Sequence, residues 1–149
     1  METKNKPKKL ERIRRSIGGL KHRCHVNLLG IAGGLSLWWN DEVDICIFKA
    51  SANMIHTICK DVPLNEEWYA TFLHTDCRDD VRCMFWEENR DLSKNLNKQW
   101  FIIGDFNNIS AMDDKEGGDI LDTRKLEELQ NLLLDCELSE LSFKGPIYT

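Results

Sequence analysis

No run of apolar residues in this sequence is long enough to cross a lipid bilayer, which takes about 20 residues of helix. The basic start, METKNKPKKLERIRR, is not followed by the apolar stretch of a secretory signal. We therefore expect an intracellular protein that is neither secreted nor held in a membrane. The glycosylation sequon Asn108-Ile109-Ser110 should then stay unmodified, because glycosylation requires the secretory route.

Paired cysteines are also absent, since none of the six cysteines belongs to a C-x-x-C motif. In an intracellular protein we expect reduced thiols, most of them small core residues. His22, Cys24 and His25 lie close together and raise the question of metal binding. Their spacing matches no standard zinc site and no second ligand pair follows, so we expect no zinc there.

The two signs of charge are not evenly distributed. Residues 1–25 carry nine Lys/Arg and two Glu, a net +7, whereas residues 26–149 carry eleven Lys/Arg and twenty-three Asp/Glu, a net −12. A basic segment can follow the phosphates of a nucleic acid, although a solvated helix face is the more common meaning of such a run. The acidic remainder argues against a broad nucleic-acid-binding surface and is compatible with a small cation site.

The pattern of apolar residues predicts an α/β protein, without internal repeats, that is long enough for one domain. Helices are expected over 8–17, over 79–97 and after Thr123, and a polar loop over 111–122. Strands are expected over 35–39, 43–50, 53–60, 68–75 and 100–103, the second and third forming a hairpin. Strands grouped in hairpins and interrupted by helices favour an α/β sandwich with mixed sheets.

Each of the later helices is expected to bury one apolar face. For the helix over 79–97 the residues on adjacent turns are Val81, Phe85 (or Met84), Glu88 and Leu92. For the helix after Thr123 the stripe is Leu126, Leu129, Leu133 and Cys136.

The stretch WFIIGDFNNI, residues 100–109, raises the question of function. Its apolar strand ends at Gly104 and Asp105, and Asn107 would lie on the same side as Asp105 if the chain stayed extended. A carboxylate can orient or deprotonate water, and an amide can hold a phosphate oxygen, so the pair suits phosphate-ester hydrolysis. The alternative is an ordinary turn, which is the more common meaning of Gly, Asp and Asn.

Two further residues are candidates. Glu2 precedes the basic helix, and His74 closes an apolar strand before a polar turn. His74 is placed to pair with a phosphate or a carboxylate, although a single histidine at a strand end is more often structural.

Seven stretches occur in the order found in the endonuclease/exonuclease/phosphatase superfamily, and together they span nearly the whole chain. They are METK, GIAGGLSLWWND, WYATFLHT, DDVRCMFWEE, WFIIGDFNNI, DKEGG and LSFKGPIYT. The chain most resembles the version in plant LINE-type (non-LTR) retrotransposon polyproteins, where the domain precedes a reverse transcriptase.

This resemblance implies a DNase I-like fold, a four-layer α/β sandwich of two mixed sheets flanked by helices. It implies Mg²⁺-dependent cleavage of a phosphodiester in DNA, with Mn²⁺ as an alternative ion, and no small-molecule cofactor. Glu2 matches the family's metal-binding glutamate, Asp105 the aspartate that activates water, and Asn107 the asparagine that steadies the scissile phosphate. His74 stands where the family usually has a tyrosine. A nuclear location follows from DNA as the target.

The resemblance also implies that residues 1–149 form an incomplete domain. The family's first strand, with an asparagine that helps to hold the metal, would precede Glu2, and its final aspartate-histidine pair would follow Thr149. Two hypotheses therefore remain. One is a DNA endonuclease domain fragment of retrotransposon origin with weak or no activity, and the other is a non-catalytic remnant or passive binding fragment.

Overall fold

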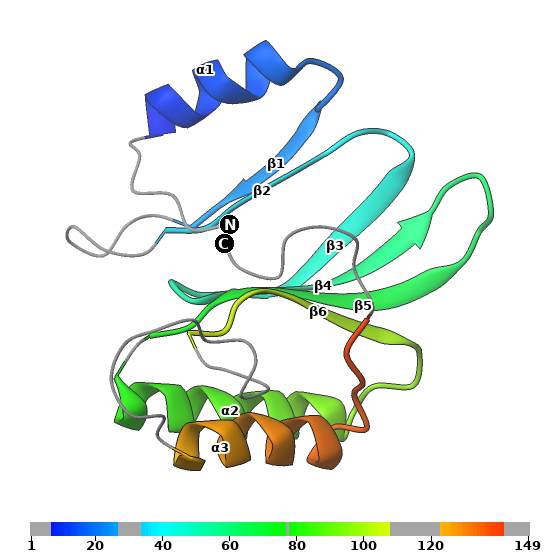
Figure 1. The fold of residues 1–149 in the computed structure, drawn as a ribbon. Helices are drawn as coiled ribbons and strands as arrows, with labels where there is room; N and C mark the ends of the chain where they lie inside the picture. The colour runs from blue at the N-terminus through cyan, green and yellow to red at the C-terminus, as the bar shows by residue number, and fades with distance from the viewer. Residues whose placement is uncertain (1–6, 27–33, 77, 108–122, 142–149) are drawn as a thin grey trace. The chain divides into compact units, whose positions relative to one another are not determined.

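The computed structural model describes residues 7–26, 34–76, 78–107 and 123–141. These ranges contain three helices and six strands (Figure 1). In chain order they are α1 (Pro7–Ile17), β1 (His22–His25), β2 (Ser36–Trp39), β3 (Val43–Ala50), β4 (Met54–Asp61), β5 (Glu67–His74), α2 (Asp79–Ser93), β6 (Trp100–Asp105) and α3 (Thr123–Asp135). The chain divides into two compact units, of which the first holds α1 and all six strands and the second holds α2 and α3.

The first unit contains two sheets. One has four strands in the order β3-β4-β5-β6, in which β5 and β6 run parallel and the other neighbours are antiparallel. The other is the antiparallel pair β1-β2. The mixed α/β class and the β3-β4 hairpin, both predicted from the sequence, are confirmed.

Strand β1 was not predicted. Its four residues, HRCH, contain no alternation of apolar and polar side chains that would indicate a strand. It exists because it pairs along its whole length with β2, from His22 opposite Trp39 to His25 opposite Ser36. The same pairing separates the three clustered residues, because alternation puts His22 and Cys24 on one face of the strand and His25 on the other.

The core of the four-stranded sheet lies on its inner strands. Met54, Ile55 and Thr57 of β4 are at most 1% exposed, so both faces of this strand are covered. Thr71 and Leu73 of β5 are equally buried. A strand covered on both faces does not need to alternate, which explains the weak alternation of β4 in the sequence.

In the second unit, α2 buries a different face from the one predicted. Its buried residues are Arg82, Phe85, Trp86 and Asn89. The prediction placed Val81, Glu88 and Leu92 on the turns next to Phe85 or Met84; Val81, Glu88 and Leu92 are half-buried, and Met84 is exposed. The actual face includes two polar residues, which are tolerated because they have partners: Arg82 pairs with Asp79 and Glu128, and the Asn89 amide donates to the Phe85 carbonyl.

Helix α3 follows its predicted stripe only in part. Leu129 and Cys136 are buried as expected, but the most buried residue is Leu132, whereas Leu133 is half-buried. Of the five described cysteines, all free thiols, only Cys59 and Cys136 are buried, so the expectation of mostly core cysteines is wrong for the others. Residues 111–122, the predicted polar loop, lie outside the described residues. No helix in the described ranges is long and apolar enough to span a membrane.

Candidate active site at the ends of β5 and β6

The parallel pairing of β5 with β6 brings two of the predicted site residues together. The register runs from Tyr69 opposite Trp100 to His74 opposite Asp105. Because the strands are parallel, both carboxyl ends reach the same edge of the sheet, where ligand groups collect in α/β proteins. His74 and Asp105 are the last residues of the two strands.

The two side chains approach each other closely. The His74 Nδ1 atom lies 3.8 Å from the Asp105 Oδ2 atom, an ion pair when the imidazole is protonated. The Asp105 side chain is 64% exposed, whereas that of His74 is 18% exposed. A shielded imidazole therefore lies beside a carboxylate that solvent and a ligand can reach.

Backbone hydrogen bonds hold both residues in place. The Asp105 carbonyl accepts a hydrogen bond from the Thr75 amide at 2.9 Å. The His74 carbonyl accepts one from the Asn53 side chain at 2.9 Å, and the His74 amide donates to the Asn53 carbonyl at 2.9 Å. These bonds position the pair without using either functional side chain.

Gly104 lies inside the strand and not at its end. The sequence placed the end of the apolar strand at Gly104 and Asp105, but Gly104 lies inside β6 with a φ of 152°. A Cβ atom at this position would be 1.8 Å from the Leu73 carbonyl oxygen. Only glycine therefore allows β6 to approach β5 this closely, one residue before Asp105.

The prediction that Asn107 shares a side with Asp105 required an extended chain. Strand β6 ends at Asp105, and Asn107 has a φ of 44°, in the left-handed region. Asparagine tolerates this conformation better than most residues, and it is typical of turns. Strand alternation therefore does not place Asn107 on the same side as Asp105, and its backbone has the conformation of a turn residue.

Glu2, the predicted metal ligand, lies outside the described residues. Within the described ranges, no three His, Cys, Asp or Glu side chains are grouped as a metal site. The oxygens of Asp105 are of the hard type that Mg²⁺ prefers, and their exposure leaves room for the waters that this ion keeps. The donor chemistry at the ends of β5 and β6 thus fits Mg²⁺.

Both histidines of the cluster formed by His22, Cys24 and His25 have other partners. The His22 imidazole bonds instead to the Asp41 carboxylate, with 2.9 Å between Nε2 and Oδ1. The His25 imidazole shares a hydrogen bond of 2.7 Å with the Ser36 hydroxyl.

No protein-family model matches the sequence, and no curated protein matches it either. The residues and their geometry are therefore the basis of the function proposed below.

Proposed function

We propose that this chain is a Mg²⁺-dependent phosphodiester hydrolase domain of the endonuclease/exonuclease/phosphatase type, acting on DNA. The observation that carries the proposal is the pairing of Asp105 with His74 at the carboxyl ends of two parallel strands. A four-layer DNase I-like sandwich, a retrotransposon origin and a nuclear location belong to the same proposal. Mn²⁺ is the alternative ion.

The proposed chemistry divides between a few side chains. The exposed Asp105 carboxylate orients the attacking water and accepts its proton. His74, whose Nδ1 atom lies 3.8 Å from the Asp105 carboxylate, donates a hydrogen bond to a phosphate oxygen. Asn107 steadies the scissile phosphate.

Glu2 is the proposed ligand of Mg²⁺. When bound, this ion would polarise a phosphoryl oxygen and offset the negative charge that develops on it. The exposure of Asp105 permits water and a phosphate to reach the carboxylate together, which a buried carboxylate would prevent.

Nicking of supercoiled plasmid tests the proposal. The purified chain, incubated with Mg²⁺, should convert supercoiled plasmid to open circles, and EDTA should stop the conversion. Asp105→Ala should lower the nicking rate by about 100- to 1,000-fold, the usual effect of removing one group that stabilises a transition state. His74→Ala should also lower it, by a smaller factor, because its contact with phosphate is one of several.

Asp44→Ala is the matched control, since it removes the same side chain from an exposed position of β3. Its nicking rate should equal that of the unaltered chain, and urea unfolding should show that every variant folds. Nicking that survives Asp105→Ala would rule out the proposed site. A folded chain that never nicks would favour the alternative, a non-catalytic remnant or passive binding fragment.

A further inference from the structure

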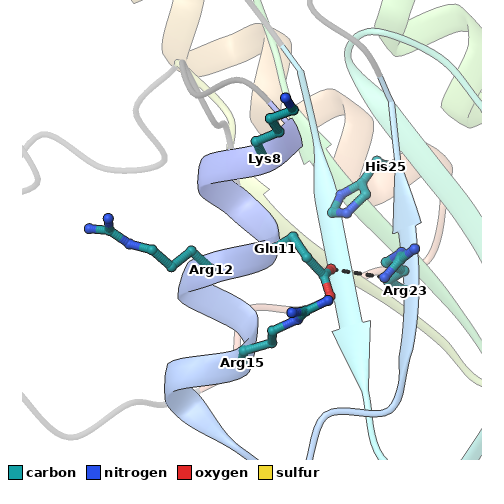
Figure 2. Close-up of a pocket in the computed structure, with 6 residues that line it drawn as sticks. All are labelled: Lys8, Glu11, Arg12, Arg15, Arg23 and His25. Atoms are coloured by element: carbon teal, nitrogen blue, oxygen red, sulfur yellow. Dashed lines mark hydrogen bonds and ion pairs between the residues drawn. The ribbon is translucent and has the colours of Figure 1, made fainter.

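A basic cleft lies between α1 and β1, within the first unit. It has a volume of about 410 Å³ and is lined by Lys8, Glu11, Arg12, Arg15, Arg23 and His25 (Figure 2). Four of these residues are cationic and one is anionic, so the cleft carries a net positive charge. The sequence indicated a basic segment, but only the fold brings Arg23 and His25 of β1 next to the basic residues of α1.

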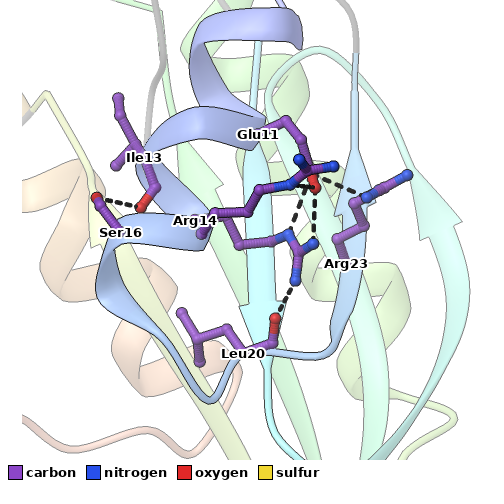
Figure 3. A network of polar contacts seen from close by, with 7 residues as sticks. Glu11, Ile13, Arg14, Ser16, Leu20 and Arg23 are labelled. Atoms are coloured by element: carbon purple, nitrogen blue, oxygen red, sulfur yellow. Dashed lines mark hydrogen bonds and ion pairs between the residues drawn. The ribbon is translucent and has the colours of Figure 1, made fainter.

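Glu11 organises the cleft. Its carboxylate accepts hydrogen bonds from Arg14 at 2.7 and 3.1 Å, from Arg15 at 3.0 Å and from Arg23 at 2.8 Å (Figure 3). Arg14 also donates to the Leu20 carbonyl. The hydrogen bonds from Arg14, followed by that from Arg15 and the charge of Arg23, lower the pKa of Glu11 to about 2. One carboxylate, ionised at any physiological pH, thus joins the helix to the strand and orients their guanidinium groups.

The cleft also contains cations that are available to bind a ligand. Lys8 and Arg12 make no hydrogen bond or ion pair with any part of the chain that the structure describes, and the Arg12 side chain extends away from Glu11 (Figure 2). The Arg15 side chain is 75% exposed and contacts Glu11 through Nε. Two cations without a carboxylate partner, beside the exposed guanidinium of Arg15 on the same helix, are suited to an anion.

The spacing of these cations indicates what kind of anion. Lys8, Arg12 and Arg15 are separated by four and three residues, so they share one face of α1 on successive turns about 5.4 Å apart. A row of this kind matches a ligand whose charges repeat along a chain. Arginine in addition presents a planar fork of donors that suits phosphate oxygens. A membrane surface fits less well, because Leu10 of this helix is 5% exposed and Ile13 is half-buried, which leaves Ile17 as its exposed apolar residue.

We propose that the α1–β1 cleft binds the phosphate backbone of DNA, with Lys8, Arg12 and Arg15 contacting successive phosphates. The choice of DNA as the polyanion rests on the proposed function, whereas the site itself is distinct from Asp105 and His74. Binding at the cleft does not require hydrolysis. Its contacts carry no base specificity, since they reach only the backbone.

Fluorescence anisotropy with a short labelled DNA duplex tests this, with EDTA present so that no hydrolysis occurs. The double variant Arg12→Gln/Arg15→Gln should weaken binding about tenfold or more, because two phosphate contacts are lost. Lys60→Gln/Lys94→Gln changes the net charge equally, on β4 and just after α2, and should change the affinity less than twofold. Urea unfolding establishes that both variants fold.

Equal weakening by the two double variants would overturn the proposal, because binding would then follow overall charge. Absence of binding by the unaltered chain, or tighter binding to anionic lipid vesicles or polyglutamate than to DNA, would also overturn it. If the unaltered chain binds DNA through the cleft but never nicks it, the proposed hydrolase function is rejected and the cleft proposal stands. If the chain nicks DNA but its binding does not depend on the cleft residues, the cleft proposal is rejected and the hydrolase function stands.

Discussion

At the residue scale, the position of Asp105 depends on Gly104. Its φ of 152° is one that side-chain-bearing residues rarely adopt, and the Leu73 carbonyl occupies the place of a Cβ atom. This close approach lets β6 complete its register with β5 up to His74 and Asp105. Glycine at position 104 is therefore required for β6 to place Asp105 opposite His74.

Gly104→Ala should therefore destabilise the protein by clearly more than about 2 kcal/mol, through backbone strain and the clash with Leu73 together. Gly19→Ala is the matched control, because Gly19 also has a positive φ, 70°, but nothing lies within 4 Å of a Cβ there. The control should lose about 1–2 kcal/mol from strain alone. Urea unfolding of both variants measures the difference, and an equal loss would show that the contact with Leu73 is unimportant.

At the scale of elements, β4, β5 and β6 are linked by a buried polar network. The Thr71 hydroxyl accepts a hydrogen bond from the Trp100 indole at 2.8 Å and shares one of 2.7 Å with the His56 imidazole. The His56 ring stacks on Tyr69, with 5.8 Å between centroids. Burial lowers the pKa of His56, which is 3% exposed, and the charge of Lys49 lowers it further.

This lowered pKa makes the stability of the sheet depend on pH. Because the folded protein disfavours protonated His56, its contribution is complete above the unfolded pKa of about 6.5 and is lost as the pH falls towards the folded value. Urea unfolding midpoints should therefore decrease from about pH 7.5 to about pH 5. His56→Gln should show a smaller decrease, since Gln does not titrate, and an unchanged decrease would assign the effect to other groups.

At the scale of the whole molecule, charge is segregated along the chain. The basic residues concentrate before residue 26 and the acidic residues after it. In the folded chain, part of the basic segment lines the α1–β1 cleft, where Glu11 is the single anion among the lining residues. An acidic remainder repels DNA, so binding should depend on a few local contacts and respond strongly to salt.

With three phosphate contacts, the logarithm of the DNA affinity should fall with the logarithm of the salt concentration at a slope of about −3. Raising the salt from about 50 to about 200 mM would then weaken binding about 40-fold. Anisotropy titrations at several salt concentrations measure the slope. Arg12→Gln/Arg15→Gln should reduce its magnitude by about two, whereas a slope near zero would exclude phosphate contacts.

Across these scales, prediction from the sequence succeeded where the pattern is local. The helices α1, α2 and α3 and the strands β2 to β6 follow from periodicity within a few residues. Strand β1 did not follow, because HRCH is a strand only through its pairing with β2. The buried face of α2 was also mispredicted, because Arg82 becomes a core residue only when Glu128 of α3 lies near it.

In the candidate site, too, the local features could be predicted from the sequence and the long-range features could not. Asp105 and His74 were both recognised as polar residues at strand ends, which is a local feature. Their register across β5 and β6 joins residues far apart in the sequence, and so does the pairing of Glu11 with Arg23.

The sequence by itself determined the types of element, the mixed α/β class and the separation of basic from acidic segments, because these depend on side chains a few positions apart. Tertiary structure alone decided which strand ends meet, which polar residues are buried and which cations share a cleft. Those features depend on contacts between residues far apart in the sequence, and such contacts form only when the chain folds.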